Sequence, residues 1–158
     1  MRQIKFRGKQ LNGEWAYGDL LRIGGGCIIY IGSKTETATP DIPKESEVAV
    51  ELFDNDIAIV IPDTIGQFTG LTDRNGKEIY EGDIIRSPLN HEVVVKYGYK
   101  EHRVSHHGVV DSFAAYGWIV ENLKNGLTDF LDNDFLQGEV IENVFDNPEL
   151  ITNQPIEV

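Results

Sequence analysis

Three histidines stand close together in the second half of the chain, and they are the side chains best suited to hold a metal ion. His102, His106 and His107 have Glu101 and Asp111 nearby. Neutral imidazoles and a carboxylate can coordinate Zn²⁺ in a three-ligand site. The H-E-x-x-H spacing of zinc peptidases is absent, however, and the polar segment is typical of a solvated loop. These histidines are therefore weak metal candidates, and we expect a loop here.

Aromatic and basic side chains alternate just before the histidines, at Lys96, Tyr97, Tyr99, Lys100 and Arg103. Tyrosines interleaved with cations are typical of the platforms on which single-stranded nucleic acid stacks. The same pattern also fits an ordinary solvated strand, whose aromatic bodies pack inward while its charges reach water. The segment is a candidate surface for nucleic acid or for a protein partner.

The other reactive residue types lack the neighbours that catalysis needs. Cys27 lies in a short apolar run, which predicts a buried and inert thiol. The glycines at 24–26 precede it without the Lys-Ser/Thr of a phosphate-binding loop. Asp129, Asp132 and Asp134 lack the central Gly and closing Glu of a calcium loop. We therefore predict no catalytic residue, no cofactor and no enzymatic activity.

The chain is strongly acidic, with a formal net charge of −12 over 158 residues. Such a charge repels phosphates and disfavours binding to nucleic acid without excluding it; we expect no membrane partner. A single cysteine forms no internal disulfide, which indicates a reducing compartment. No leader-like start and no apolar run of about 18 residues is present. These features predict a cytoplasmic protein.

Short apolar segments separated by turn residues predict many short strands and few helices. The expected strands are at residues 4–7, 14–21, 27–31, 47–53, 57–61, 65–71, 77–80, 84–86, 92–97, 118–121 and 139–145. Asn12-Gly13, the glycines at 24–26, and residues 73–76 and 81–83 are expected turns, and residues 33–44 an expected loop. Helical spacing of apolar residues makes residues 127–136 the best helix candidate, with Thr128 as its cap, but this short acidic segment also fits a loop.

The stretch PDTIGQFTGLTDRNGKEIYEGDII at residues 62–85 is the most distinctive part of the sequence. Together with IKFRGK at 4–9, EWAYGDL at 14–20 and EVIENVFDNPELI at 139–151, it resembles the YopX-like family of phage and prophage proteins. The resemblance implies a small phage-encoded protein with an SH3-type β barrel in its later half. It implies no molecular function and supplies no catalytic residues. Within the stretch, the glycines and Asp83 are interpreted as turn architecture, with Tyr80 and Ile84 in the core.

The expected fold is therefore mainly β, with at most one or two short helices. We expect a hairpin-rich N-terminal β region at 1–62, an SH3-like barrel region at 63–151 and a flexible tail at 152–158. The first functional hypothesis is a phage or prophage accessory protein in the bacterial host cytoplasm, acting through a protein partner or as a homo-oligomer. The second is a nucleic-acid-associated SH3-like module, and the third a metal-dependent hydrolase that uses the histidines.

Overall fold

The computed structural model describes residues 3–32, 56–106 and 109–152. The chain divides into two compact units, residues 1–67 and 68–158, and each is considered by itself. Both are built from antiparallel strands, which confirms the prediction of a mainly β protein. Among the described residues, no helix has the length and apolar character needed to cross a membrane.

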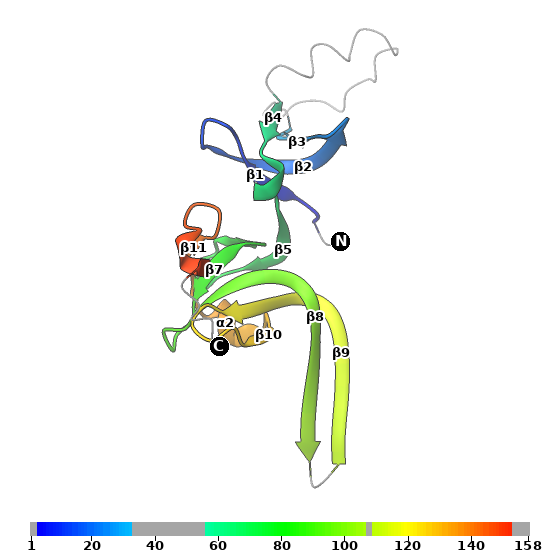
Figure 1. The fold of residues 1–158 in the computed structure, drawn as a ribbon, viewed down its shortest axis with the longest axis vertical. Coiled ribbons are helices and arrows are strands. Elements are labelled where there is room, and N and C mark those ends of the chain that lie inside the picture. Colours follow the sequence, from blue (N-terminus) through cyan, green and yellow to red (C-terminus); the bar gives the residue numbers. More distant parts are fainter. Residues whose placement is uncertain (1–2, 33–55, 107–108, 153–158) are drawn as a thin grey trace. The chain divides into compact units, whose positions relative to one another are not determined.

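The first unit is an antiparallel sheet whose first three strands are joined by tight turns. In the order β4-β3-β2-β1, it contains β1 (Phe6–Lys9), β2 (Trp15–Ile23), β3 (Gly26–Tyr30) and β4 (Ile57–Val60) (Figure 1). The predicted Asn12-Gly13 turn is confirmed, because Gly13 has a φ of 89° and donates to the Gln10 carbonyl at 3.0 Å. A 3₁₀ turn, η1 (Pro62–Thr64), leads into β5 (Gly66–Thr72), whose first residues pair with β1.

One face of this first sheet carries a small apolar core. Its buried side chains alternate along the strands with exposed ones, and they are Ala16, Cys27, Ile29, Ala58 and Val60. Cys27 is free and buried, so the predicted buried thiol is confirmed. The expected loop at 33–44 and the expected strand at 47–53 lie outside the described residues.

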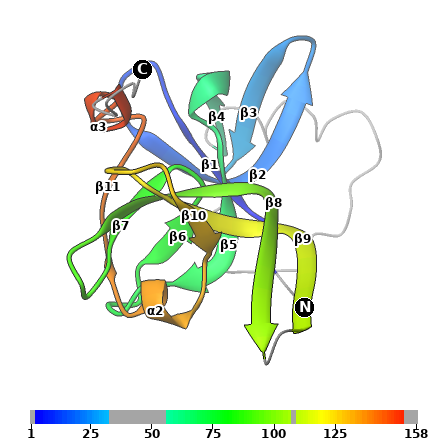
Figure 2. The ribbon, with the colours of Figure 1, turned by 60° about the horizontal axis from the view of Figure 1, so that its bottom comes forward.

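The second unit is organised around a five-stranded antiparallel sheet in the order β10-β9-β8-β7-β11. These strands are β7 (Asp83–Arg86), β8 (Glu92–His106), β9 (Val109–Asn122), β10 (Thr128–Phe130) and β11 (Glu139–Asn143). A further strand, β6 (Glu78–Tyr80), pairs with β5 at Phe68 and at Thr72, with a register shift between the two. Two single-turn helices follow, α2 (Asn133–Leu136) between β10 and β11 and α3 (Glu149–Thr152) after β11 (Figure 2).

The core of the second unit lies on one side of this sheet. Its buried members are Ile79, Ile85, Val93, Val95, Val120 and Val140. Tyr80 and Ile84 are also buried, as predicted. The turn at 81–83 is confirmed: Gly82 has a φ of 84°, and the Asp83 carboxylate accepts the Tyr80 N–H at 2.8 Å.

Several expectations for the second unit are wrong. The strands expected at 92–97 and 118–121 are parts of the much longer β8 and β9. The helix expected over 127–136 is instead β10 followed by the four-residue α2. Asp132, and not Thr128, caps α2, because its carboxylate accepts the Asp134 N–H at 3.0 Å. The described pairings leave the five-stranded sheet open, so the SH3-like barrel is not confirmed.

Candidate interaction site on the β8–β9 arm

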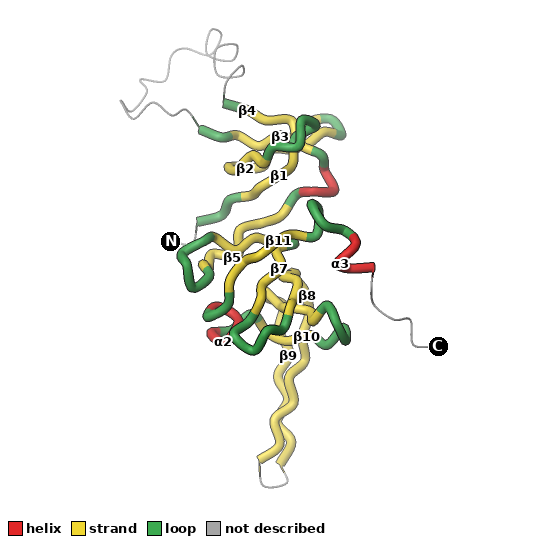
Figure 3. Tube along the Cα trace, turned by 90° about the vertical axis from the view of Figure 1, so that its left-hand side faces the viewer, coloured by secondary structure: helices red, strands yellow, loops and turns green. Residues whose placement is uncertain are grey.

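The far halves of β8 and β9 leave the five-stranded sheet together and form an arm, defined here as residues 97–106 and 109–118. β7 pairs with β8 only at residues 92–94, and β10 pairs with β9 only at 119–121. From Tyr97 opposite Trp118 to His106 opposite Val109, the two strands pair with each other. No other described strand pairs with them. Figures 1 and 3 show this long hairpin extending beyond β7 and β10.

A pair of glycines lies at the base of the arm. Gly98 stands directly opposite Gly117 in the β8–β9 register. Facing glycines leave both strands without side chains at one level, which favours a local bend of the ribbon. The strand expected at residues 92–97 continues through Gly98 as part of β8.

One face of the arm is aromatic and exposed. Tyr97 packs edge-on against Trp118 with ring centroids 5.2 Å apart, and Tyr99 lies against Tyr116 at 5.4 Å. Because strand side chains alternate between faces, these two cross-strand pairs share the same face. Tyr97 and Tyr99 are each 55% exposed and Tyr116 is 73% exposed. We call Tyr97, Tyr99, Tyr116 and Trp118 the tyrosine face.

The lysines of the candidate surface lie on the opposite face of the β8–β9 ribbon, Lys96 just before the arm and Lys100 within it. The Lys96 ammonium forms an ion pair with Glu121 on β9 at 2.7 Å. The Lys100 ammonium donates to the Thr128 carbonyl on β10. Arg103 lies farther along β8, opposite Ser112. The structure therefore brings the tyrosines together but directs both lysines away from them, toward acceptors within the same unit.

The histidine segment is a strand and not the expected loop. His102 lies opposite Phe113 and His106 opposite Val109, both within β8. His107 lies outside the described residues. The described part of the chain contains no group of three His, Cys, Asp or Glu side chains arranged to hold a metal ion.

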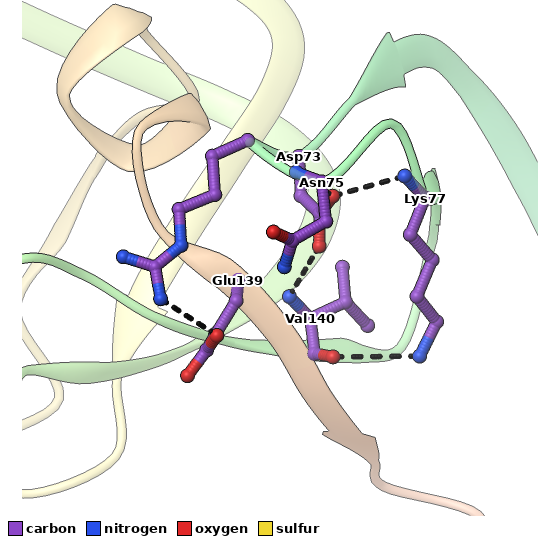
Figure 4. Close-up of polar contacts among 6 residues, drawn as sticks. Asp73, Asn75, Lys77, Glu139 and Val140 are labelled. Carbon is purple, nitrogen blue, oxygen red and sulfur yellow. Dashed lines mark hydrogen bonds and ion pairs between the residues drawn. The ribbon is translucent and has the colours of Figure 1, made fainter.

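A second polar feature, centred on Asp73, connects the turn after β5 to β11 (Figure 4). One carboxylate oxygen of Asp73 accepts the backbone N–H of Asn75 at 2.8 Å and of Lys77 at 2.9 Å. The other accepts the N–H of Val140 at 2.9 Å. On the outside of this junction, Arg74 pairs with Glu139 at 2.8 Å. Asp73 thus joins segments that are 67 residues apart in the chain.

The environment of Asp73 favours its charged form. Burial opposes ionisation and by itself would raise the pKa of Asp73, since a buried charge loses hydration. The three backbone N–H donors and the positive charge of Lys77 act in the opposite direction and prevail, so the pKa lies below its ordinary value. All its described contacts are structural, which agrees with the interpretation of this stretch as turn architecture.

The acidic residues near β10 line a hollow of about 420 Å³ that they share with Leu89 and Phe135. Asp132 caps α2, and the Asp129 carboxylate accepts the Phe130 N–H at 2.8 Å. Both carboxylates therefore have local backbone partners. Nothing in this arrangement distinguishes a ligand site from ordinary helix and turn capping.

Comparison with known protein families tests the family resemblance that the sequence motifs indicated. The family described as YopX protein matches residues 5–152, which is nearly the whole chain. The chain belongs to the YopX family. A comparison with curated proteins finds no match. The matched residues extend over parts of both units of this YopX protein.

Proposed function

We propose that this YopX protein is an accessory protein of a phage or prophage that works in the host cytoplasm by contacting another protein, without catalysing a reaction. The observation that supports this proposal is the tyrosine face, an exposed aromatic surface on an arm that leaves the sheet. Exposed clusters of large aromatic side chains are typical of protein interaction sites, where Tyr and Trp serve as rigid anchors.

Binding of single-stranded nucleic acid is the competing function for the same tyrosines. Two observations favour a protein partner. Lys96 and Lys100 lie on the other face and are engaged with Glu121 and Thr128, so they are not beside the tyrosines to hold a phosphate backbone. The net charge of −12 also opposes the approach of phosphates.

Affinity capture from a lysate of the host bacterium tests the proposal. The full chain and the double variant Tyr99→Ser/Tyr116→Ser are each used as bait, with and without nuclease treatment, and the retained proteins are identified by mass spectrometry. We expect the wild-type chain to retain a specific host or phage protein after nuclease treatment. The double variant should lose that protein, because serine removes the aromatic anchors while keeping a polar, strand-compatible side chain.

The control variant is Tyr17→Ser, which removes a tyrosine that is 47% exposed on β2 of the first unit. This variant should capture the same protein as the wild-type chain. Loss of all retained material on nuclease treatment would instead favour the nucleic-acid function. Equal capture by the double variant would show that the arm is not the contact surface.

A further inference from the structure

Among the described residues, the backbone edges of the arm are open beyond its base, where the Trp118 carbonyl accepts the Leu131 N–H at 3.1 Å. In the described part of the chain, each strand of the arm has its partner on one side and no strand on the other. A two-stranded ribbon of this kind is only marginally stable in water, and open edges pair readily with another strand. The arm is therefore a two-stranded ribbon that contact with further protein would stabilise.

The charge of the arm differs from that of the rest of the chain. The arm and its connecting residues, 97–118, contain two cations, Lys100 and Arg103, and two anions, Glu101 and Asp111, so their formal charge is zero. The whole chain carries −12. Two copies repel each other over most of their surfaces, and the arm is a place where identical copies can meet without that repulsion.

The tyrosine face is suited to a symmetric contact with the same face of a second copy. Both strands contribute to it, with Tyr97 and Tyr99 from β8 and Tyr116 from β9. A two-fold axis brings the same patch of two subunits together, so the patch must complement itself. Aromatic rings meet this condition because they pack on one another in offset or edge-to-face arrangements.

We propose that the tyrosine face is covered by the arm of a second copy of this chain, in a two-fold symmetric dimer. This inference rests on the proposed function, because it identifies a second copy of the chain as a protein partner of the tyrosine face. Dimerisation packs the two aromatic faces against each other and removes their rings from water.

Sedimentation equilibrium of the full chain over about 1–100 μM tests the dimer directly. We expect the wild-type chain to show a concentration-dependent change from monomer to dimer. Tyr99→Ser/Tyr116→Ser should weaken the dimer by about tenfold or more, as loss of central aromatic anchors does. Tyr17→Ser should leave the dissociation constant within about twofold of wild type. Circular dichroism of each variant confirms that the β fold is kept.

Two results would overturn the proposal: a wild-type chain that stays monomeric across the range, or a folded double variant that dimerises as tightly as wild type. The dependence of the dimer dissociation constant on salt concentration is a second test. If the contact is aromatic and the arm is neutral, added salt screens the repulsion between the acidic bodies and tightens the dimer. A dimer that weakens as salt rises would show that ion pairs hold it, contrary to the proposal.

The dimer and the broader function fail in different ways. A chain that is monomeric yet captures an arm-dependent protein from lysate disproves the dimer and supports the proposed function. A chain that dimerises through the arm but captures no other protein supports the dimer and disproves contact with a different partner. A nucleic acid found on the arm of a monomeric chain disproves both.

Discussion

The Asp73 carboxylate satisfies three backbone N–H groups, two in its own turn and one on β11. Carboxylates in this position connect local turn geometry to a distant strand, because each oxygen serves a different segment. The turn residues and Gly76 follow from the sequence, since Asp-x-Asn-Gly is a turn pattern in its own right. The bond to Val140 could not be predicted, because nothing local in the sequence identifies a partner 67 residues away.

Asp73→Asn should destabilise the second unit by about 1–3 kcal/mol. The amide oxygen can still accept from Asn75 and Lys77, but the amide nitrogen is a donor and cannot accept the Val140 N–H. A buried donor is then left without a partner. Urea unfolding followed by circular dichroism measures the change. Asp63→Asn, at an exposed aspartate in η1, is the matched control and should change stability little. Equal midpoints for the two variants would contradict the structural role of Asp73.

The stability difference between the wild-type chain and Asp73→Asn should depend on pH. The native pKa of Asp73 is lowered, so its contribution is complete above the unfolded-state pKa of about 3.9 and is lost as pH falls through the native pKa. The urea midpoint difference should therefore be constant between about pH 5 and 7 and shrink below about pH 4. A difference that grew on acidification would mean that the native pKa is raised.

At the scale of elements, the arm should be separable from the fold of the second unit. Every described member of the buried core lies outside residues 99–116. Gly98 and Gly117 face each other, so an Asn-Gly turn can replace residues 99–116 and join them as a short hairpin. We expect this variant to keep the β spectrum and to unfold within about 1 kcal/mol of the wild-type chain at low concentration. A large loss of stability would show that the arm is part of the fold.

The length of the arm escaped sequence-based prediction for a physical reason. Strands are recognised by alternating apolar and polar residues, which arise when one face is buried against a core. Exposed tyrosines occupy one face of the arm, and Lys100 lies on the other. Because these tyrosines face water and not a buried core, YGYKEHRVSH lacks that alternation. The candidate residues were identified by type, but their division between two faces required the register.

The expected helix over 127–136 was wrong for a different reason. Leu131, Phe135 and Leu136 do pack against the core of the second unit, which explains their apolar character. They reach it from the end of β10 and from α2, however, and not from one continuous helix. The pairing of β10 with β9 outweighs helix propensity at residues 128–130. The turns at Asn12-Gly13 and 81–83 were predictable because their chemistry is local.

At the scale of the whole molecule, two separate apolar cores support the two units. One contains Cys27 and Ile29, and the other contains Ile79, Ile85, Val93, Val95, Val120 and Val140. Each unit has its own buried side chains, so each is expected to have its own free energy of opening. Cys27 is the only cysteine in the chain and is buried in the first core, which makes it a specific reporter of opening in that unit.

Matched truncations in the two cores test this independence. Ile29 and Ile85 are both fully buried, and Ile→Ala at either position should cost its unit about 2–5 kcal/mol through lost burial and a cavity. Ile29→Ala should therefore greatly accelerate the reaction of Cys27 with a thiol reagent. Ile85→Ala should leave that rate near wild type while speeding amide exchange at Val93 and Val95. If Ile85→Ala accelerated Cys27 labelling as much as Ile29→Ala does, the two units would open as one cooperative body. A partner bound to the arm would then stabilise the first core as well as the second.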